Sequence, residues 1–120
     1  MAQAFQDLIV WQSALELTVR VYELSRTFPK DELYGLTSQL RRASVSVASN
    51  IAEGRGRINE GEFRQFLGIA QGSTFEVQTQ LLVARQLKLG DEAMLRKAEA
   101  LCIETSKMLG ALIQSLKARG

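Results

Sequence analysis

The sequence predicts an all-α protein folded as an antiparallel, up-down-up-down four-helix bundle. Apolar residues recur every three or four positions along four long segments, and no segment alternates with a period of two. A single proline among 120 residues fits long uninterrupted helices. Only a few residues separate the segments, so consecutive helices should run antiparallel. Residues 1–120 are therefore expected to form one domain.

The first helix is expected over residues 7–27, with Asp7 as its N-cap and Phe28-Pro29 ending it. Its apolar residues form two adjacent stripes, a band wider than one bundle seam requires. One stripe consists of Trp11, Ala14, Leu15, Thr18, Tyr22 and Ser25, and the other of Val10, Leu17, Val21, Leu24 and Phe28. This surplus of apolar surface predicts that copies of the chain associate.

The second helix is expected to begin between Asp31 and Leu36. It should end at the Gly54-Arg55-Gly56-Arg57 segment, where Gly54 would adopt the left-handed conformation of a helix C-terminus. Its expected core seam follows intervals of three and four residues and consists of Leu36, Leu40, Ala43, Val47 and Ile51.

The third helix should open with Asn59 and Glu62 as a capping box, and Gly90 should end it before Asp91 caps the fourth. Both helices have a continuous apolar face. The expected core residues are Phe63, Phe66, Leu67, Ala70, Val77, Leu81 and Ala84 in the third helix, and Leu95, Ala98, Leu101, Cys102, Thr105, Leu109, Leu112 and Leu116 in the fourth. Gly72 in the middle of the third helix indicates either a local distortion of the helix or, as the favoured cause, close packing against another helix, of this chain or of another subunit.

A polar stripe follows one face of the second helix and meets a second stripe on the third. The stripes consist of Gln39, Arg42, Ser46, Asn50, Glu53 and Arg57, and of Glu62, Ser73, Glu76 and Gln80. In a hairpin turning near residues 57–60, positions whose numbers sum to about 118 face each other. This register pairs Arg42 with Glu76, Gln39 with Gln80, and Glu53 with Arg64.

The stripe has two interpretations. It is either a groove that binds a ligand, or a hydrogen-bonded seam or subunit interface, which the need of buried polar groups for partners favours. A di-metal site at Glu53, Glu62 and Glu76 is disfavoured, because such bundle sites use histidine and the chain has none. The absence of histidine also excludes Ser-His and Cys-His nucleophiles, so no enzyme activity and no cofactor are expected.

The charge distribution points to the middle of the chain. Residues 35–90 contain seven basic and four acidic groups, and six of the basic groups are arginine. Arg55 and Arg57 near the start of the third helix could hold a phosphate, although a helix-terminating turn with solvated arginines is the alternative. Cys102 is expected to be a buried, unreactive thiol. No signal peptide or membrane span is evident, which favours a cytoplasmic location.

The chain resembles the bacterial four-helix-bundle proteins encoded in intervening sequences of 23S ribosomal RNA genes. The matching segments lie between residues 5 and 81 and are residues 5–12, Phe28-Pro29, residues 34–36 and 39–43, Asn50-Ile51-Ala52-Glu53-Gly54, Gly56-Arg57, Glu62-Phe63, Phe66-Leu67, Ala70, Gly72-Ser73, Glu76 and Gln80-Leu81. The last helix, after about Leu89, matches only in pattern. The resemblance implies a ring, typically a homopentamer, without established catalytic activity. The family is also similar to the accessory protein of diversity-generating retroelements, a pentameric barrel that binds nucleic acid and a reverse transcriptase.

These observations lead to one functional expectation and one rival. The expected function is a non-enzymatic, ring-forming homo-oligomer that associates with RNA or a ribonucleoprotein through Arg41, Arg55, Arg57 and Arg64. The rival is a protein-interaction scaffold that binds no nucleic acid. An enzyme that uses carboxylates of the polar stripe is the least favoured class.

Overall fold

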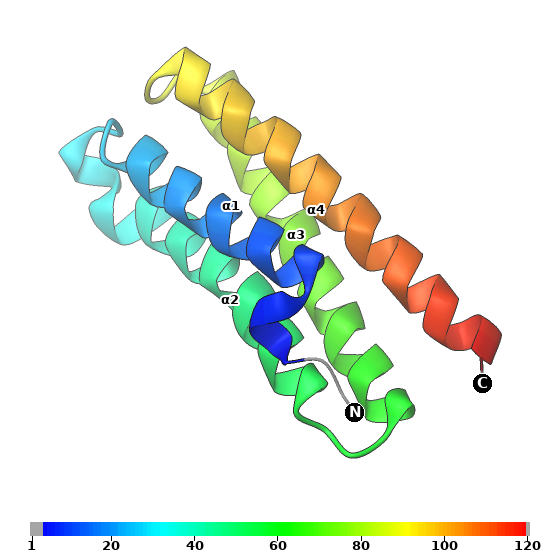
Figure 1. Cartoon of the computed structure of the whole chain (residues 1–120). Coiled ribbons are helices and arrows are strands. Elements are labelled where there is room, and N and C mark those ends of the chain that lie inside the picture. The colour runs from blue at the N-terminus through cyan, green and yellow to red at the C-terminus, as the bar shows by residue number, and fades with distance from the viewer. Residues whose placement is uncertain (1–3, 120) are drawn as a thin grey trace.

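The computed structural model describes residues 4–119 and confirms the predicted four-helix bundle. Within these residues the helices are α1 (Ile9–Ser25), α2 (Ser38–Arg55), α3 (Glu60–Gln86) and α4 (Glu92–Arg119). Each helix packs against the next one in the chain, and α1 packs against α4, so the four form a closed antiparallel square (Figure 1). The described part contains no β-strand.

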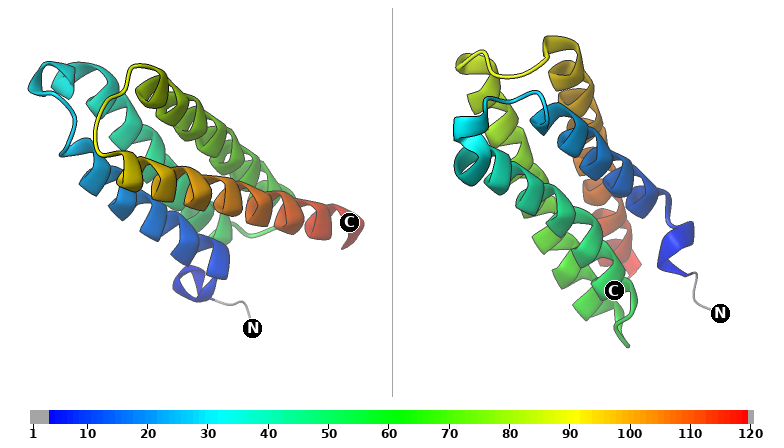
Figure 2. Two further views of the ribbon diagram at one scale, coloured as in Figure 1. Left: turned by 90° about the horizontal axis from the view of Figure 1, so that it is seen from above. Right: turned by 90° about the vertical axis from the view of Figure 1, so that its left-hand side faces the viewer.

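The bundle is elongated, with principal extents of 46 × 20 × 20 Å. The α1–α2 and α3–α4 connections lie together at one end, which we call the double-loop end (Figures 1 and 2). The α2–α3 turn lies at the opposite end, which we call the single-turn end. None of the helices in residues 4–119 is long and apolar enough to cross a bilayer.

The core consists of two clusters along the bundle, and both are formed by the predicted helix faces. Toward the double-loop end it contains Leu17, Val21, Leu24, Leu40, Ala43, Val77, Leu81, Leu95 and Cys102. Toward the single-turn end it contains Val10, Ala14, Val47, Ile51, Phe63, Leu67, Ala70, Leu109 and Leu116. On α1, the stripe that includes Leu17 is buried, whereas Leu15 and Val19 are close to half exposed.

The expected N-cap of α1 is wrong. Asp7 belongs to a short 3₁₀ turn, η1 (Phe5–Asp7), and α1 begins at Ile9 after an extended Leu8, with no side chain capping it. The chain approaches the helix from this turn, and the Gln12 side chain donates a hydrogen bond to the carbonyl of Gln6 at 2.9 Å. The turn therefore takes the place at which the sequence predicted the first residue of the helix.

Regular α2 begins at Ser38, two residues beyond the predicted window. Two short turns, η2 (Lys30–Glu32) and η3 (Leu33–Thr37), precede it. The backbone of Gly35 has φ −109° and ψ −112°, outside the helical region, so η3 contains a kink. The carboxylate of Glu32 accepts a hydrogen bond from the Leu36 amide at 3.3 Å across this kink.

The predicted left-handed role of Gly54 is also wrong, because this glycine lies inside α2 and is buried. A Cβ atom at this position would lie 2.6 Å from the Cβ of Phe66 on α3. Glycine is therefore required by the close approach of the two helices, and α2 continues to Arg55. The sequence shows the glycine but does not show the helix that crosses it.

The structure confirms the predicted N-caps of α3 and α4 at Asn59 and Asp91 but corrects the end of α3. The Asn59 side chain accepts from the Glu62 amide, and Asp91 accepts from the Met94 amide. Lys88, with φ 57°, supplies the left-handed residue at the end of α3, and Gly90, with φ 75°, follows in the connection. The amides of Lys88 and Leu89 bond back to α3 carbonyls in a Schellman motif.

The two connections at the double-loop end contact each other. The hydroxyl of Thr27 donates to the carbonyl of Leu24 at 2.6 Å and accepts from the amide of Asp91 at 2.9 Å. A Cβ added at Gly90 would lie 2.7 Å from the ring of Phe28, so the two loops are in close contact. This contact ties the end of α1 to the start of α4.

Candidate nucleic-acid interface

Two of the predicted arginines at the single-turn end lie against aromatic rings of α3. The guanidinium carbon of Arg55 lies 5.6 Å from the ring centroid of Phe63. That of Arg57 lies 4.6 Å from the ring centroid of Phe66, and its Nη2 also donates to Glu53 at 2.9 Å. Neither arginine is a freely solvated side chain, because a cation over a ring face is attracted to it.

The turn also contains acidic groups. Arg64 is half-buried on α3, while Glu60 and Glu62 are exposed in its first turn. Asn59 already caps the amide of Glu62. The helix N-terminus therefore does not form a purely cationic cradle, and the arginine side chains are the groups that could contact phosphate.

Arg41 lies at the double-loop end, so the four predicted arginines do not form one surface. Its Nε donates to the hydroxyl of Ser25 at 2.7 Å, and its guanidinium carbon lies 4.8 Å from the ring centroid of Tyr22. These contacts hold the side chain across the α1–α2 groove. Tyr22 and Ser25 were assigned to the apolar stripe of the first helix, and their part in fixing Arg41 was missed.

The polar stripe is a short intramolecular hydrogen-bond network with exposed ends. The hydroxyls of Ser46 and Ser73 are 2.9 Å apart, and the Asn50 amide donates to the hydroxyl of Ser46 at 2.9 Å. The Ser46–Ser73 contact confirms the predicted hairpin register to within one residue. The seam interpretation therefore holds for the middle of the stripe.

The predicted pairs at the ends of the stripe are wrong. Arg42 and Glu76 are exposed and form no ion pair within residues 4–119. Glu53 pairs with Arg57 one turn along its own helix instead of with Arg64. Gln39 is exposed, and the side-chain oxygen of buried Gln80 has no hydrogen-bond partner in the described part of the chain. The exposed side chains of Gln39, Arg42 and Glu76 reach water, which solvates them without a partner, whereas the Gln80 oxygen is buried.

The carboxylates of the stripe do not converge. Because Ser46 faces Ser73, Glu53 lies opposite position 66 and Glu76 lies opposite position 43. The two carboxylates are thus separated by about ten residues along the hairpin, or ~15 Å at the helical rise. Within residues 4–119, no three acidic or cysteine side chains come together as a metal site would require.

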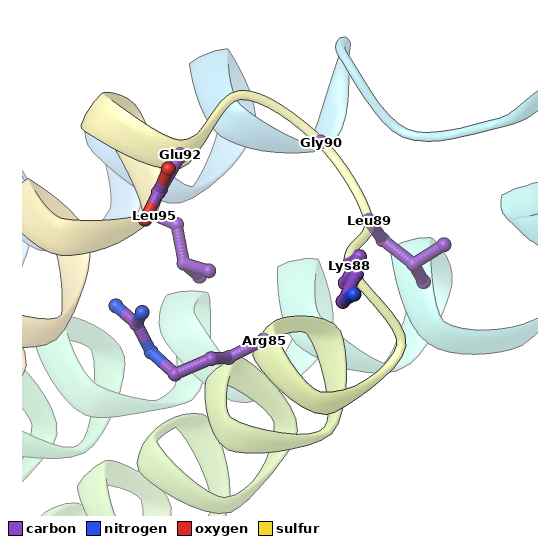
Figure 3. Close-up of a pocket in the computed structure, with 6 residues that line it drawn as sticks. All are labelled: Arg85, Lys88, Leu89, Gly90, Glu92 and Leu95. Atoms are coloured by element: carbon purple, nitrogen blue, oxygen red, sulfur yellow. The ribbon is translucent and has the colours of Figure 1, made fainter.

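A pocket of mixed charge lies between the end of α3 and the start of α4 (Figure 3). Arg85, Lys88 and Glu92 line it together with Leu95, and Figure 3 shows the Arg85 side chain extending toward α4. Two hydrogen bonds connect the Arg85 guanidinium to the carboxylate of Glu99, and they raise the pKa of Arg85 above its ordinary value. This guanidinium is already neutralised, so the pocket is a poor anion site.

Cys102 faces the core, as the sequence predicted. The residue is fully buried, and its Sγ lies 3.2 Å from the carbonyl oxygen of Thr74, to which the thiol donates. Burial raises the pKa of the Cys102 thiol to about 12. The thiolate, which is the nucleophilic form, is therefore suppressed near neutral pH.

The sequence of the chain shows which protein family it comes from. The model of the 23S rRNA-intervening sequence proteins matches residues 6–111. The chain belongs to this family. No curated protein matches the chain with statistical significance.

The fold of this family member has a solved counterpart. A crystal structure of a protein of unknown function from the S23 ribosomal protein family of Bacteroides thetaiotaomicron is similar, with a TM-score of 0.80 and 21% sequence identity. The match covers 88% of the present chain and 98% of the other. At this identity the likeness supports the four-helix fold alone.

Proposed function

We propose that the protein is a non-enzymatic homo-oligomer that binds RNA through arginines fixed at its surface. The observation that carries this proposal is that three of the four predicted arginines rest on aromatic rings. Arg41 lies over Tyr22, Arg55 over Phe63 and Arg57 over Phe66. A guanidinium fixed in this way loses less conformational freedom on contacting a phosphate. Arg57 uses one N–H for Glu53 and Arg41 uses one for Ser25, and the other N–H groups of these guanidiniums are the donors proposed for phosphate.

The non-enzymatic part rests on the chemistry available in the chain. There is no histidine to act as a general base near neutral pH. Glu53 and Glu76, the carboxylates considered for catalysis, lie far apart on the hairpin and are both exposed. The name of the family refers to ribosomal RNA genes, and this agrees with a role close to RNA.

Self-association is supported by apolar side chains that the complete core leaves outside. Leu15, Val19 and Val45 are 41–46% exposed on α1 and α2. Leu15 and Val45 line a hollow of about 320 Å³ together with Trp11 and Ala48. A second group on α3 and α4 consists of Phe75, Leu82 and Ile103, which are 40–54% exposed. Two different apolar surfaces permit head-to-tail contacts, which form a ring when the rotation between neighbouring subunits closes. Five subunits is the number that the family resemblance implies.

Light scattering tests the assembly. The native chain should have several times the 13.3 kDa chain mass, five times in a pentamer. Val45→Glu and Phe75→Glu should each dissociate it, and a mixture of the two variants should form a species of twice the chain mass. This result is expected because each variant retains one intact surface. Ile58→Glu, at a fully exposed turn residue, is the control and should not change the mass.

RNA binding is tested by titrating a labelled single-stranded RNA at low salt, about 50 mM. The affinity should fall steeply as salt rises, and the Arg55→Ala, Arg57→Ala double variant should bind more weakly. Arg96→Ala is the matched control, because Arg96 is an exposed arginine on α4 that pairs only with Glu92. If the native chain binds no RNA, the RNA-binding half of the proposal is wrong. Capture of a protein partner that resists nuclease would then favour the scaffold alternative.

A further inference from the structure

A hollow at the double-loop end combines positive charge with an exposed aromatic ring. It has a volume of about 400 Å³ and is lined by Tyr22, Leu33, Tyr34, Thr37, Ser38, Arg41 and Arg42. No acidic side chain lines it. The hollow is shallow and open to solvent, and its volume lies within the range of small-ligand sites.

Tyr34 is the unusual member of this group. Its relative exposure is 93%, so its ring contributes almost nothing to the core. It lies in η3 directly before Gly35, whose non-helical backbone separates this residue from the regular part of α2. The bond from the Leu36 amide to the Glu32 carboxylate spans this kink, so Tyr34 is presented by an ordered turn.

The two arginines of the hollow differ in how they are held. Arg41 is fixed by Ser25 and by the ring of Tyr22, and both of its terminal nitrogens remain free to donate. Arg42 is exposed and forms no ion pair within residues 4–119. One fixed and one free guanidinium therefore face the same hollow, and the hydroxyls of Thr37 and Ser38 line it beside them.

We propose that this hollow binds one nucleotide of single-stranded RNA, with the phosphate on Arg41 and Arg42 and the base stacked on Tyr34. A nucleotide combines an anion with a flat base, and these match the two kinds of group present. Bases stack on protein aromatics only where they are not already stacked in a duplex, so single strands are the expected ligand. An acidic peptide would use the arginines but would have no flat group for Tyr34.

The inference rests on the proposed RNA binding and adds a second contact region to it. Arg55, Arg57 and Arg64 lie at the opposite end of a bundle 46 Å long. The ring of Tyr34 and the side chain of Arg42 have no structural role in the described chain, so their removal should not disturb the fold. Both are therefore suitable positions for a test in the full chain.

The test measures binding of a labelled, short single-stranded oligouridine by fluorescence anisotropy. Tyr34→Ala should weaken binding about 5- to 150-fold, which corresponds to the loss of one stacked base. Tyr34→Phe keeps the ring and should bind within about twofold of the native chain. Arg42→Ala should weaken binding and reduce the slope of log affinity against log salt by about 0.7, as expected for one lost phosphate contact on a single strand.

The outcomes separate the two proposals. If the native chain binds the RNA and Tyr34→Ala binds it equally well, the nucleotide site is wrong while the proposed function stands. If the native chain binds no RNA at low salt, the RNA-binding part of the proposed function fails and the nucleotide site fails with it. If an oligoglutamate peptide competes fully and Tyr34→Ala has no effect on either probe, the hollow is a site for acidic peptides instead.

Discussion

Two glycines on the α2–α3 hairpin show opposite environments. Gly54 faces inward, and a Cβ there would lie 2.6 Å from the Cβ of Phe66. Gly72 faces outward from the middle of α3, with no atom within 4 Å of an added Cβ, and Gly68 one turn earlier is equally open. Packing within the chain thus requires glycine at position 54, whereas no contact within the chain requires it at position 72.

This difference separates the requirements of the fold from those of an assembly. A glycine in the middle of a helix costs about 1 kcal/mol relative to alanine. At Gly54 the close helix contact offsets that cost. The close intramolecular packing predicted for Gly72 is therefore wrong, and contact with another subunit is the explanation that remains as a prediction.

The largest expected effect is on the reaction rate of the Cys102 thiol, which packs against the buried side of α3. With a pKa of about 12 compared with an ordinary 9.0, the folded thiol should react with a thiol reagent at pH 8 about a thousandfold more slowly than in the unfolded chain. Reaction rates in buffer and in urea measure this ratio. Equal rates would show that the inner side opens freely to solvent.

The same thiol affects stability at high pH. Its folded-state pKa lies above the unfolded value, so the folded chain holds the proton more tightly. This contribution to stability is complete below pH 9 and is lost as the pH rises toward 12. Urea denaturation of the native chain and of Cys102→Ala across this range should show a steeper loss for the native chain.

The next effect tests the close approach at the hairpin. Gly54→Ala should lower the free energy of unfolding by about 1–3 kcal/mol, because the backbone-anchored Cβ of Phe66 cannot move aside without shifting α3. Urea denaturation measures the change. Gly56→Ala is the control, since its Cβ would meet only carbonyl oxygens at 3.5 Å or more. Equal effects of both substitutions would contradict the packing role of Gly54.

The outward glycine should respond in the opposite direction. Gly72→Ala should stabilise the dissociated chain by about 0.5–1 kcal/mol, because it removes the cost of a mid-helix glycine and meets no atom. If a second subunit covers this face, the same substitution should reduce the mass measured by light scattering. An unchanged mass would remove the intersubunit explanation for Gly72.

The smallest effect concerns the end of α3. Lys88 occupies a left-handed conformation, with φ 57°, that glycine adopts without a steric cost. Lys88→Gly should therefore raise stability by about 0.5–1 kcal/mol in urea denaturation. Gln86→Gly, at the last residue of α3, should lower stability instead. A loss of stability with Lys88→Gly would mean that the lysine side chain has a contact worth more than the strain.

Sequence periodicity predicted what depends on one helix at a time. The core faces and the caps at Asn59 and Asp91 follow from spacing within one helix, and the structure agrees. The register of Ser46 against Ser73 involves two helices and was predictable because the turn between them is short. Other features that depend on a neighbouring helix were missed. Gly54 was taken for a helix end because the sequence does not show that Phe66 packs against it. The ion pair of Arg42 with Glu76 was expected because residue spacing does not show that both side chains are exposed to solvent.

The candidate site was predicted only in part. An excess of arginine in the middle of the chain singled out Arg41, Arg55 and Arg57, but the aromatic partners come from α1 and α3. Tyr34 lies in the uncertain start of the second helix, and its 93% exposure is evident only in the structure. The binding role proposed for Tyr34 also depends on Arg42, which the sequence analysis assigned to the polar stripe.

The hydroxyl of Thr27 has a consequence for the order in which the chain folds. Three of the four helix contacts join consecutive helices and can form locally, whereas the α1–α4 contact closes a loop of most of the chain. Thr27 bonds to Asp91 on that last contact and also to the carbonyl of Leu24 near the end of α1. We expect Thr27→Val to accelerate unfolding and to leave the folding rate nearly unchanged, which is the behaviour of a contact that forms late in folding. Equal changes in the two rates would contradict this order.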